Sequence, residues 1–182
     1  MRIIAGIYKG RTVKFPKFKL VRPTTDRNKE AIFNYLTNKI DFDDILACDI
    51  YAGSGSLGLE MLSRGAGEVH FVENSFQVSQ VLKENIKSLA AVNKTNLFKM
   101  DAVKFTRDSP PRQYDLIIAD PPFFKDDIYI VVKQIIENKF LSPQGILIVE
   151  RSIQTKRNDI NEFDAEPIKK LGDSLIYQFI NE

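Results

Sequence analysis

The stretch ILACDIYAGSGSLG, residues 45–58, decides the fold of this chain. Its apolar beginning predicts a buried strand, and Gly53, Gly55 and Gly58 follow in the spacing G-x-G-x-x-G. Glycine permits a tight turn and a close approach of the backbone to a ligand, and the loop opens a helix that stops near Gly65. A strand, a ligand-binding loop and a helix in this order are typical of a sheet of parallel strands.

Apolar strands and amphipathic helices alternate through the rest of the chain. Continuous apolar strands are typical of parallel sheets covered by helices on both faces. The last two strands are joined by only Gly172-Asp173, so we expect an antiparallel edge there. We therefore expect an α/β fold with a mainly parallel, seven-stranded sheet. Its strands are predicted at residues 45–48, 69–72, 96–99, 116–119, 146–149, 168–171 and 174–179. The helices are expected to bury Ile32, Phe33, Leu36 and Ile40, then Val78, Val81, Leu82, Ile86 and Leu89, and later Ile128, Val131, Val132, Ile135 and Ile136.

Length and composition fit one globular domain spanning residues 1–182, which is 43% hydrophobic and 27% charged. No apolar run approaches the roughly 20 residues that a membrane span needs, and the first residues lack the apolar core of a signal peptide. We therefore expect a cytoplasmic protein without a membrane partner. Cys48 is the only cysteine and His70 the only histidine, which excludes an internal disulfide and a zinc site with the usual ligands. We expect no metal.

Basic residues are concentrated at the beginning of the chain. Residues 1–29 hold nine Lys or Arg and one acid, Asp26, although the net charge of the whole chain is only +2. Residues 1–23 are expected to form a basic extension containing a β-hairpin, with strands at 2–5 and 12–15. A basic end on an acidic body favours contact with nucleic acid. The alternative is an edge hairpin that lysines protect from aggregation.

Four acids, Asp49, Glu73, Asp101 and Asp120, each end a successive predicted strand. Carboxyl ends of parallel strands meet at the edge of the sheet where such folds bind ligands. Glu73 lies twenty residues after Gly53, where an acid can accept both hydroxyls of a ribose. On these residues alone, NAD and S-adenosylmethionine (SAM) both remain candidates.

Two of these acids favour SAM. A carboxylate at Asp49 is badly placed for a pyrophosphate but well placed for the ammonium of a methionine moiety. Asp101, with Ala102 after it, can accept a hydrogen bond from an adenine amine. Ser54 belongs to the same predicted SAM site, and Tyr51 either braces the methionine portion or simply packs. The competing interpretation is that Asp49 and Asp101 are helix or turn caps.

The sequence Asp120-Pro121-Pro122-Phe123 follows the strand at residues 116–119. Two consecutive prolines cannot continue a central strand, so the chain turns out into the crevice at the strand's end. A carboxylate, a rigid carbonyl and an aromatic ring suit a flat, amine-bearing ring, which indicates chemistry on a nucleobase. Phe123 could instead be a core aromatic residue beside a turn.

Several segments of the chain carry a family resemblance: Arg2–Gly6, Lys9–Arg11, Arg22–Thr24 with Asp26-Arg27, Ala52–Glu60, Leu62–Ala66, Phe71–Glu73, Asp120–Phe123 and the closing Gly172–Ser174. Together these segments resemble the RsmD-type methyltransferases. The similarity runs nearly from end to end, although residues 152–166 match poorly. Tyr51 and Phe123 stand where the family more often has Phe and Tyr, so residue 123 keeps a ring that can stack but lacks the phenol hydroxyl.

The resemblance implies a Rossmann-like, SAM-dependent methyltransferase fold. It also implies methylation of the exocyclic N2 of a guanine in 16S ribosomal RNA, either in the small ribosomal subunit or in an assembly intermediate. The Asp-Pro-Pro-Phe turn would then be catalytic, with Asp120 and the Pro121 carbonyl accepting the amine hydrogens and Phe123 stacking on the base. The residues expected to bind substrate are Arg2, Lys9, Arg11, Arg22, Thr24 and Arg27. For Thr24, a helix cap is an equally good interpretation.

Three other functions compete with this one. A DNA adenine-N6 methyltransferase uses the same turn, but it normally needs a sequence-reading module for which 182 residues leave no room. An NAD-dependent dehydrogenase would leave the Asp-Pro-Pro-Phe turn unexplained. A non-catalytic RNA-binding protein on a methyltransferase scaffold would be expected to lose Asp120 or the glycines, which are all present.

Overall fold

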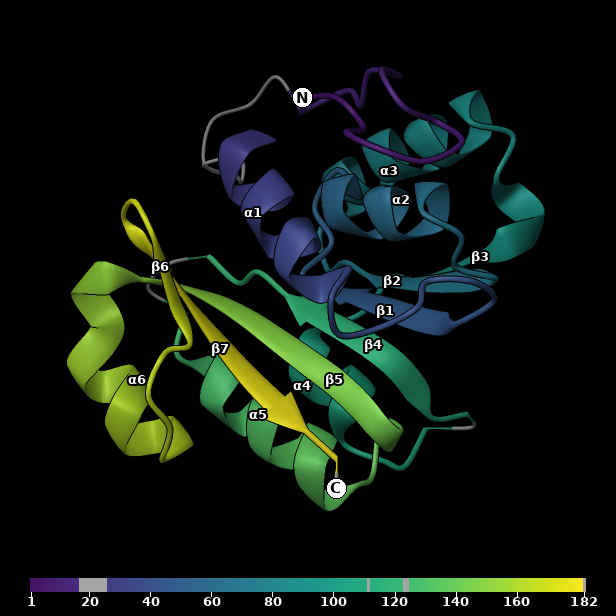
Figure 1. Ribbon diagram of the computed structural model, residues 1–182. Coiled ribbons are helices and arrows are strands. Elements are labelled where there is room, and N and C mark those ends of the chain that lie inside the picture. The colour runs from purple at the N-terminus through teal and green to yellow at the C-terminus, as the bar shows by residue number, and fades with distance from the viewer. Residues whose placement is uncertain (17–25, 111, 123–124, 182) are drawn as a thin grey trace.

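A seven-stranded sheet with the order β3-β2-β1-β4-β5-β7-β6 organises the computed structural model (Figure 1). The structure describes residues 1–16, 26–110, 112–122 and 125–181. The strands are β1 (Leu46–Ile50), β2 (Glu68–Val72), β3 (Thr95–Phe98), β4 (Tyr114–Ala119), β5 (Leu141–Ser152), β6 (Lys169–Leu171) and β7 (Ser174–Ile180). Strands β1 to β5 run parallel, whereas β7 is antiparallel to both β5 and β6. The predicted mainly parallel sheet with an antiparallel edge is confirmed.

Helices cover both faces of this sheet. In Figure 1, α1, α2 and α3 lie on one side, and α4, α5 and α6 lie on the other. The strands alternate accordingly, since Leu116 and Ile118 face the first layer while Ile117 and Ala119 face the second. This arrangement is the expected Rossmann-like α/β fold. The helices are α1 (Asp26–Leu36), α2 (Ser56–Ser63), α3 (Phe76–Ser88), α4 (Ala102–Thr106), α5 (Asp127–Glu137) and α6 (Lys156–Phe163), with short 3-10 turns η1 (Val92–Lys94) and η2 (Ile153–Thr155).

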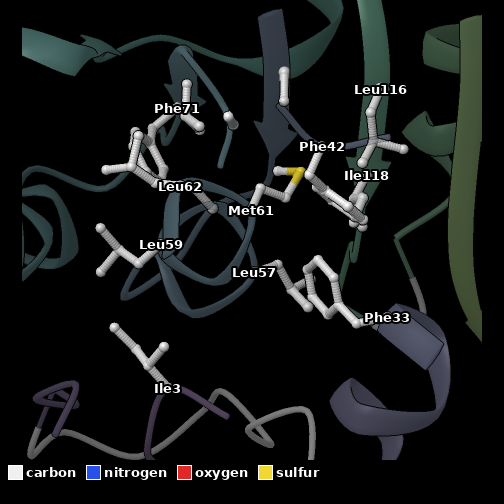
Figure 2. Packing of buried hydrophobic residues seen from close by; sticks show 14 of the residues in the cluster. Ile3, Phe33, Phe42, Leu57, Leu59, Met61, Leu62, Phe71, Leu116 and Ile118 are labelled. Atoms are coloured by element: carbon white, nitrogen blue, oxygen red, sulfur yellow. The ribbon is translucent and has the colours of Figure 1, made fainter. Parts of the chain in front are cut away.

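Helix α2 is buried along its whole length. Its inner face packs on the sheet, and residues 1–16, which we call the N-terminal arm, cover its outer face. Figure 2 shows Ile3 of the arm pointing toward Leu59 of α2. Ile3 and Val13 are both fully buried, and each such side chain contributes roughly 1.5–3 kcal/mol to folding. The arm is therefore part of the hydrophobic core.

The arm folds back on itself, but with less strand pairing than expected. Ile3 donates its backbone N–H to Arg11 and accepts that of Gly10, and Arg2 and Thr12 form one antiparallel bridge. The pairing is short because several backbone amides of the arm bond to α2 and α3 instead. Residues 17–23 of the predicted extension lie outside the described part of the chain.

The helix predictions hold with small corrections. Ile32, Phe33 and Leu36 are buried in α1 as expected, while the helix cap considered at Thr24 lies outside the described residues. Ile136 is 53% exposed, so the prediction that it joins the buried face of α5 was wrong. Ile135 beside it is fully buried, and Ile136 lies about 100° further round the helix, away from the core. No helix of the described residues is long and apolar enough to cross a membrane.

Candidate active site

Asp49 lies inside the sheet, near the carboxyl end of the central strand β1. Its side chain is 1% exposed and accepts the backbone N–H of Gly58 in α2 at 2.8 Å. Burial raises the pKa of Asp49 to about 7, the Gly58 hydrogen bond opposes this rise, and the charge of Glu73 adds to it. Because burial disfavours the ionised form of Asp49, a cation bound beside the carboxylate would stabilise that form.

Glu73, just beyond β2, holds the glycine loop in place. One carboxylate oxygen accepts the N–H of Gly53 at 2.9 Å and the other accepts the N–H of Ser75 at 2.7 Å. A carboxylate has about four acceptor positions, so ribose hydroxyls can still bind there. Gly53 has φ +54°, and a Cβ there would meet the Tyr51 carbonyl oxygen at 3.9 Å, an ordinary contact distance. Its backbone is therefore open to a ligand.

The other residues of the glycine motif are packed against protein. A Cβ on Gly55 would lie 2.3 Å from Leu82, and one on Gly58 would lie 2.2 Å from the ring of Phe71. Ser54 is buried, and its carbonyl accepts from Asn85. These contacts explain why the loop and helix need small residues; direct contact of the three with a cofactor stays a prediction.

Asp101 follows β3 and caps helix α4. Its Oδ1 accepts the N–H groups of Val103 and Lys104, which is the capping role that the sequence left open. Its Oδ2 lies 3.7 Å from Nζ of Lys125. Ala102 begins α4 and is buried. Whether Asp101 also accepts from an adenine amine stays a prediction.

Asp120 and the two prolines leave the sheet directly beside the glycine loop. The Asp120 N–H donates to the carbonyl of Ile50 in β1 at 3.4 Å, so the turn begins where β4 and β1 still pair. Asp120 is half-buried, Pro121 is buried and Pro122 is exposed. Phe123 lies outside the described residues.

A cluster that sequence reasoning missed joins this turn to the cofactor loop. Tyr51, with a left-handed φ of 63°, donates its hydroxyl to Asp127 at 3.0 Å, and burial raises its pKa. Lys125 pairs with the same Asp127 at 2.6 Å and lies over the Tyr51 ring at 5.2 Å. Arg151, fully buried, donates to the Lys125 carbonyl at 3.3 Å. Lys125 and Asp127 thus tie the end of the turn to Tyr51.

Another missed acid, Glu150, lies two residues before the end of β5. Ala119 of β4 pairs with Val149, so Asp120 and Glu150 follow side by side on neighbouring strands. Glu150 is 3% exposed and accepts from the side chain of Asn28 in α1 at 3.3 Å. Its place in a continuous apolar strand, where a charge stands out, was the signal in the sequence.

The basic residues predicted to bind substrate divide into groups. Arg2, Lys9 and Arg11 on the arm and Arg27 on α1 are exposed, and Arg11 donates to the Ser88 carbonyl at 2.6 Å. Arg22 and Thr24 lie outside the described residues. Lys29, counted with the basic end, is fully buried beside Glu60, so counting it toward a nucleic-acid surface was wrong.

No group of three or more His, Cys, Asp or Glu residues in the described part of the chain is arranged to hold a metal ion.

Comparison with known proteins agrees with the fold and shows the family of the chain. The chain matches the family described as Conserved hypothetical protein 95 over residues 1–180. The ribosomal RNA small subunit methyltransferase D of Haemophilus influenzae is 36% identical over 154 residues, which cover 82% of this chain and 78% of the relative. The protein of the same name from Escherichia coli K12 is 33% identical, covering 85% and 76%.

Solved structures give the same result. The Escherichia coli protein yhhF superimposes with a TM-score of 0.82 at 28% identity, covering 100% of this chain and 98% of the other. Magnesium protoporphyrin IX methyltransferase from Synechocystis shares the fold alone, with a TM-score of 0.64 at 14% identity, covering 85% and 78%. The fold and these relatives together define a Rossmann-like methyltransferase. Within that class the chain belongs to the Conserved hypothetical protein 95 family, the RsmD-type family that the sequence resembles.

Proposed function

We propose that this protein uses SAM to methylate the exocyclic N2 of a guanine in 16S ribosomal RNA. The observation that carries the proposal is the hydrogen bond from Asp120 to Ile50, which sets the Asp-Pro-Pro turn beside the glycine loop. Relatives named as small-subunit ribosomal RNA methyltransferases support the class of substrate. A ribosomal substrate also agrees with the cytoplasmic location expected from the sequence.

The residues around the glycine loop fit SAM. The buried Asp49 can hold the ammonium of the methionine part, Glu73 can accept from the ribose, and Asp101 stands where an adenine amine can be bound. The open space at Gly53 leaves room for a close approach of the ligand to the backbone. When bound, SAM supplies a methyl group activated by a positively charged sulfur.

Asp120 and the Pro121 carbonyl provide the acceptors for the target amine. The lone pair of guanine N2 is delocalised into the ring, which makes this nitrogen a poor nucleophile. Two acceptors that receive hydrogen bonds from its two N–H groups favour a pyramidal nitrogen whose lone pair is free to react. They also stabilise the positive charge that develops on the nitrogen. The excess proton then passes to Asp120 or to water.

The base must be outside a helical stack to reach this turn. Enzymes that act on a base take it out of the stack or bind it where it is already unpaired. Phe123, which lies outside the described residues, is proposed to stack on the extracted base, a contact that contributes about 1–3 kcal/mol per base.

Transfer of radiolabel from SAM tests the substrate class. Small subunits from a strain that lacks the modification, naked 16S RNA and adenine-containing duplex DNA are compared at equal concentrations. We expect label in the small subunit or its RNA. Label that enters only DNA would favour the adenine-N6 methyltransferase, and binding without any transfer would favour a non-catalytic RNA-binding protein.

A further inference from the structure

Two buried polar side chains connect the N-terminal arm to the glycine loop (residues 51–56). Lys29 of α1 connects the beginning of the arm to Ser56, and Asn85 of α3 connects its end to Ser54. Lys29 is fully buried and Asn85 is 2% exposed. The arm and the loop are thus joined at two independent points.

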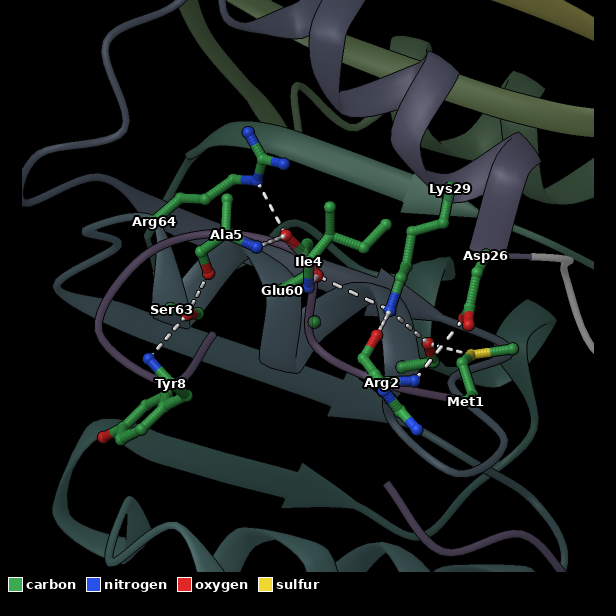
Figure 3. Close-up of polar contacts among 12 residues, drawn as sticks. Met1, Arg2, Ile4, Ala5, Tyr8, Asp26, Lys29, Glu60, Ser63 and Arg64 are labelled. Atoms are coloured by element: carbon green, nitrogen blue, oxygen red, sulfur yellow. Dashed lines mark hydrogen bonds and ion pairs between the residues drawn. The ribbon is translucent and has the colours of Figure 1, made fainter. Parts of the chain in front are cut away.

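Lys29 forms the first connection, which Figure 3 shows. Its Nζ donates to the Arg2 carbonyl at 2.6 Å and to the Ser56 hydroxyl at 3.2 Å, and it lies 3.5 Å from the carboxylate of Glu60. Ser56 is the first residue of α2, directly after Gly55. A movement of the arm at Arg2 therefore acts on Ser56, the last residue of the glycine loop.

Asn85 forms the second connection. Its Oδ1 accepts the Lys14 N–H at 2.9 Å, and its Nδ2 donates to the Lys14 carbonyl at 3.0 Å. The same Nδ2 donates to the Ser54 carbonyl at 2.9 Å. One amide group thus fixes both the end of the arm and the middle of the glycine loop.

The arm is also docked on α2 between these two points. Glu60, fully buried, accepts the N–H groups of Ile4 and Ala5 at 2.8 and 3.0 Å, as Figure 3 shows. The Ser63 carbonyl accepts the N–H of Ile7 at 2.8 Å. Buried backbone amides without partners are costly, so the arm has one well-defined seat.

We propose that Lys29 and Asn85 are positioning residues that make the basic arm a structural part of the cofactor site, so that substrate RNA on the arm and SAM in the loop bind cooperatively. The proposal rests on the proposed function for its RNA partner. Docking of the arm narrows the conformations of the loop. A ligand that holds the arm in its seat therefore strengthens cofactor binding, and the cofactor strengthens binding of that ligand by the same factor.

Gly6 and Gly10 provide a matched pair of variants for the first test. Both have a positive φ, +80° and +81°, so alanine strains the backbone equally at each. A Cβ on Gly6 would lie 1.7 Å from the Ser63 carbonyl oxygen, whereas one on Gly10 would meet nothing within 4 Å. Gly6→Ala should therefore unseat the arm, while Gly10→Ala should only add strain.

The first readout is binding of S-adenosylhomocysteine by calorimetry, without RNA. We expect Gly6→Ala to weaken binding about tenfold relative to Gly10→Ala. Equal affinities of the two variants, with circular dichroism showing both folded, would overturn the proposal.

Asn85→Ala gives a second test, and Asn138→Ala is its control. Asn138 also donates its Nδ2 to two carbonyls, those of Thr106 and Arg107, but it lies at the end of α5, on the other face of the sheet. We expect only Asn85→Ala to raise the KM for SAM, about tenfold, with kcat at saturating SAM retained. An unchanged KM, or an equal rise in both variants, would contradict a positioning role. Lys29→Arg should retain more of the wild-type affinity for the cofactor than Lys29→Met.

A third experiment measures the cooperativity between RNA binding and cofactor binding directly. Affinity for small subunits that lack the modification is measured with and without S-adenosylhomocysteine. We expect S-adenosylhomocysteine to tighten subunit binding by the wild-type protein. Asn85→Ala should abolish most of this gain in affinity. Tight subunit binding that S-adenosylhomocysteine does not change would contradict the proposed cooperativity. If subunits do not bind at all, the proposed substrate fails, while the RNA-free comparison of Gly6→Ala with Gly10→Ala still decides whether docking of the arm positions the cofactor site.

Discussion

The carboxylate of Asp49 accepts the backbone N–H of Gly58 while both residues are buried beneath the glycine loop. Burial raises the pKa of Asp49 to about 7, so a bound ammonium would select its ionised form. Affinity for S-adenosylhomocysteine should therefore fall as the pH decreases through 7, by about tenfold for each unit well below it. Calorimetry between pH 5.5 and 7.5, where the ligand amine stays protonated, measures this dependence.

Asp49→Asn should bind weakly with a flat pH profile. Asp115→Asn is the control, since Asp115 accepts from Leu46 and Ser142 at the opposite end of β1 and β4 and should keep the wild-type profile. A wild-type affinity that is constant from pH 6 to 7.5 would exclude Asp49 as the ammonium ligand.

The same residue should limit the stability of the ligand-free protein. The pKa of Asp49 is higher in the folded than in the unfolded protein. The protonated side chain is therefore compatible with the fold, whereas ionisation of Asp49 destabilises the folded state. Stability from this residue is full below about pH 4 and is lost as the pH rises to about 7. Asp49→Asn should therefore raise the free energy of unfolding at pH 8 by about 2–4 kcal/mol. Urea titrations at pH 5 and pH 8 check this, and an Asn variant less stable than wild type at pH 8 would refute it.

Asp120→Asn should leave cofactor binding intact and lower kcat at least about 100-fold, because the acceptor for the amine loses its charge. Single-turnover transfer gives the rate and calorimetry gives the cofactor affinity. Asp126→Asn, at an exposed position just before α5, is the control and should retain full activity. Retained turnover in Asp120→Asn would remove this residue from the mechanism.

Replacing Lys9, Arg11 and Lys14 with Gln should weaken RNA binding and flatten its dependence on salt, since each lost phosphate contact lowers the slope of log K against log salt by somewhat less than one. The matched control replaces Lys133, Lys139 and Lys156, which are exposed on the side of the sheet covered by α5 and α6. Equal losses in the two triple variants would mean that the arm contributes only general charge.

Glu60→Ala should destabilise the protein by about 3–5 kcal/mol, because it leaves the buried Lys29 without its carboxylate and the arm amides without acceptors. Glu84 pairs with Lys14 on the surface, so Glu84→Ala should change stability by less than about 1 kcal/mol. Chemical unfolding of both variants compares them. A Glu60→Ala loss as small as that of Glu84→Ala would show that the arm is held by apolar contacts alone.

Much of the fold could be predicted because its strands are short apolar runs between glycines and acids. The strand ends carrying Asp49, Glu73, Asp101 and Asp120 follow directly from a parallel sheet, which brings successive carboxyl ends to one edge. Helix α6 was missed because only Ile160 and Phe163 are apolar in it, and its fully buried Asp159 pairs with Arg151 at 2.9 Å.

The polar interior could not be predicted from the pattern alone. Lys29, Glu60 and Asn85 have the residue types of a solvated helix face, and in a single sequence they read as one. Their burial follows from the arm, which covers α2 and provides backbone partners that no local sequence signal reveals. Buried charges are identified only when both partners are in view.

The identity of the methylated nucleoside decides which base this protein modifies and whether Asp120 is needed. Small subunits lacking the modification are incubated with the protein and SAM, and the 16S RNA is digested and analysed by mass spectrometry. We expect N2-methylguanosine at a single position, with none formed by Asp120→Asn. N6-methyladenosine, or methylation of N2 that does not require Asp120, would contradict it.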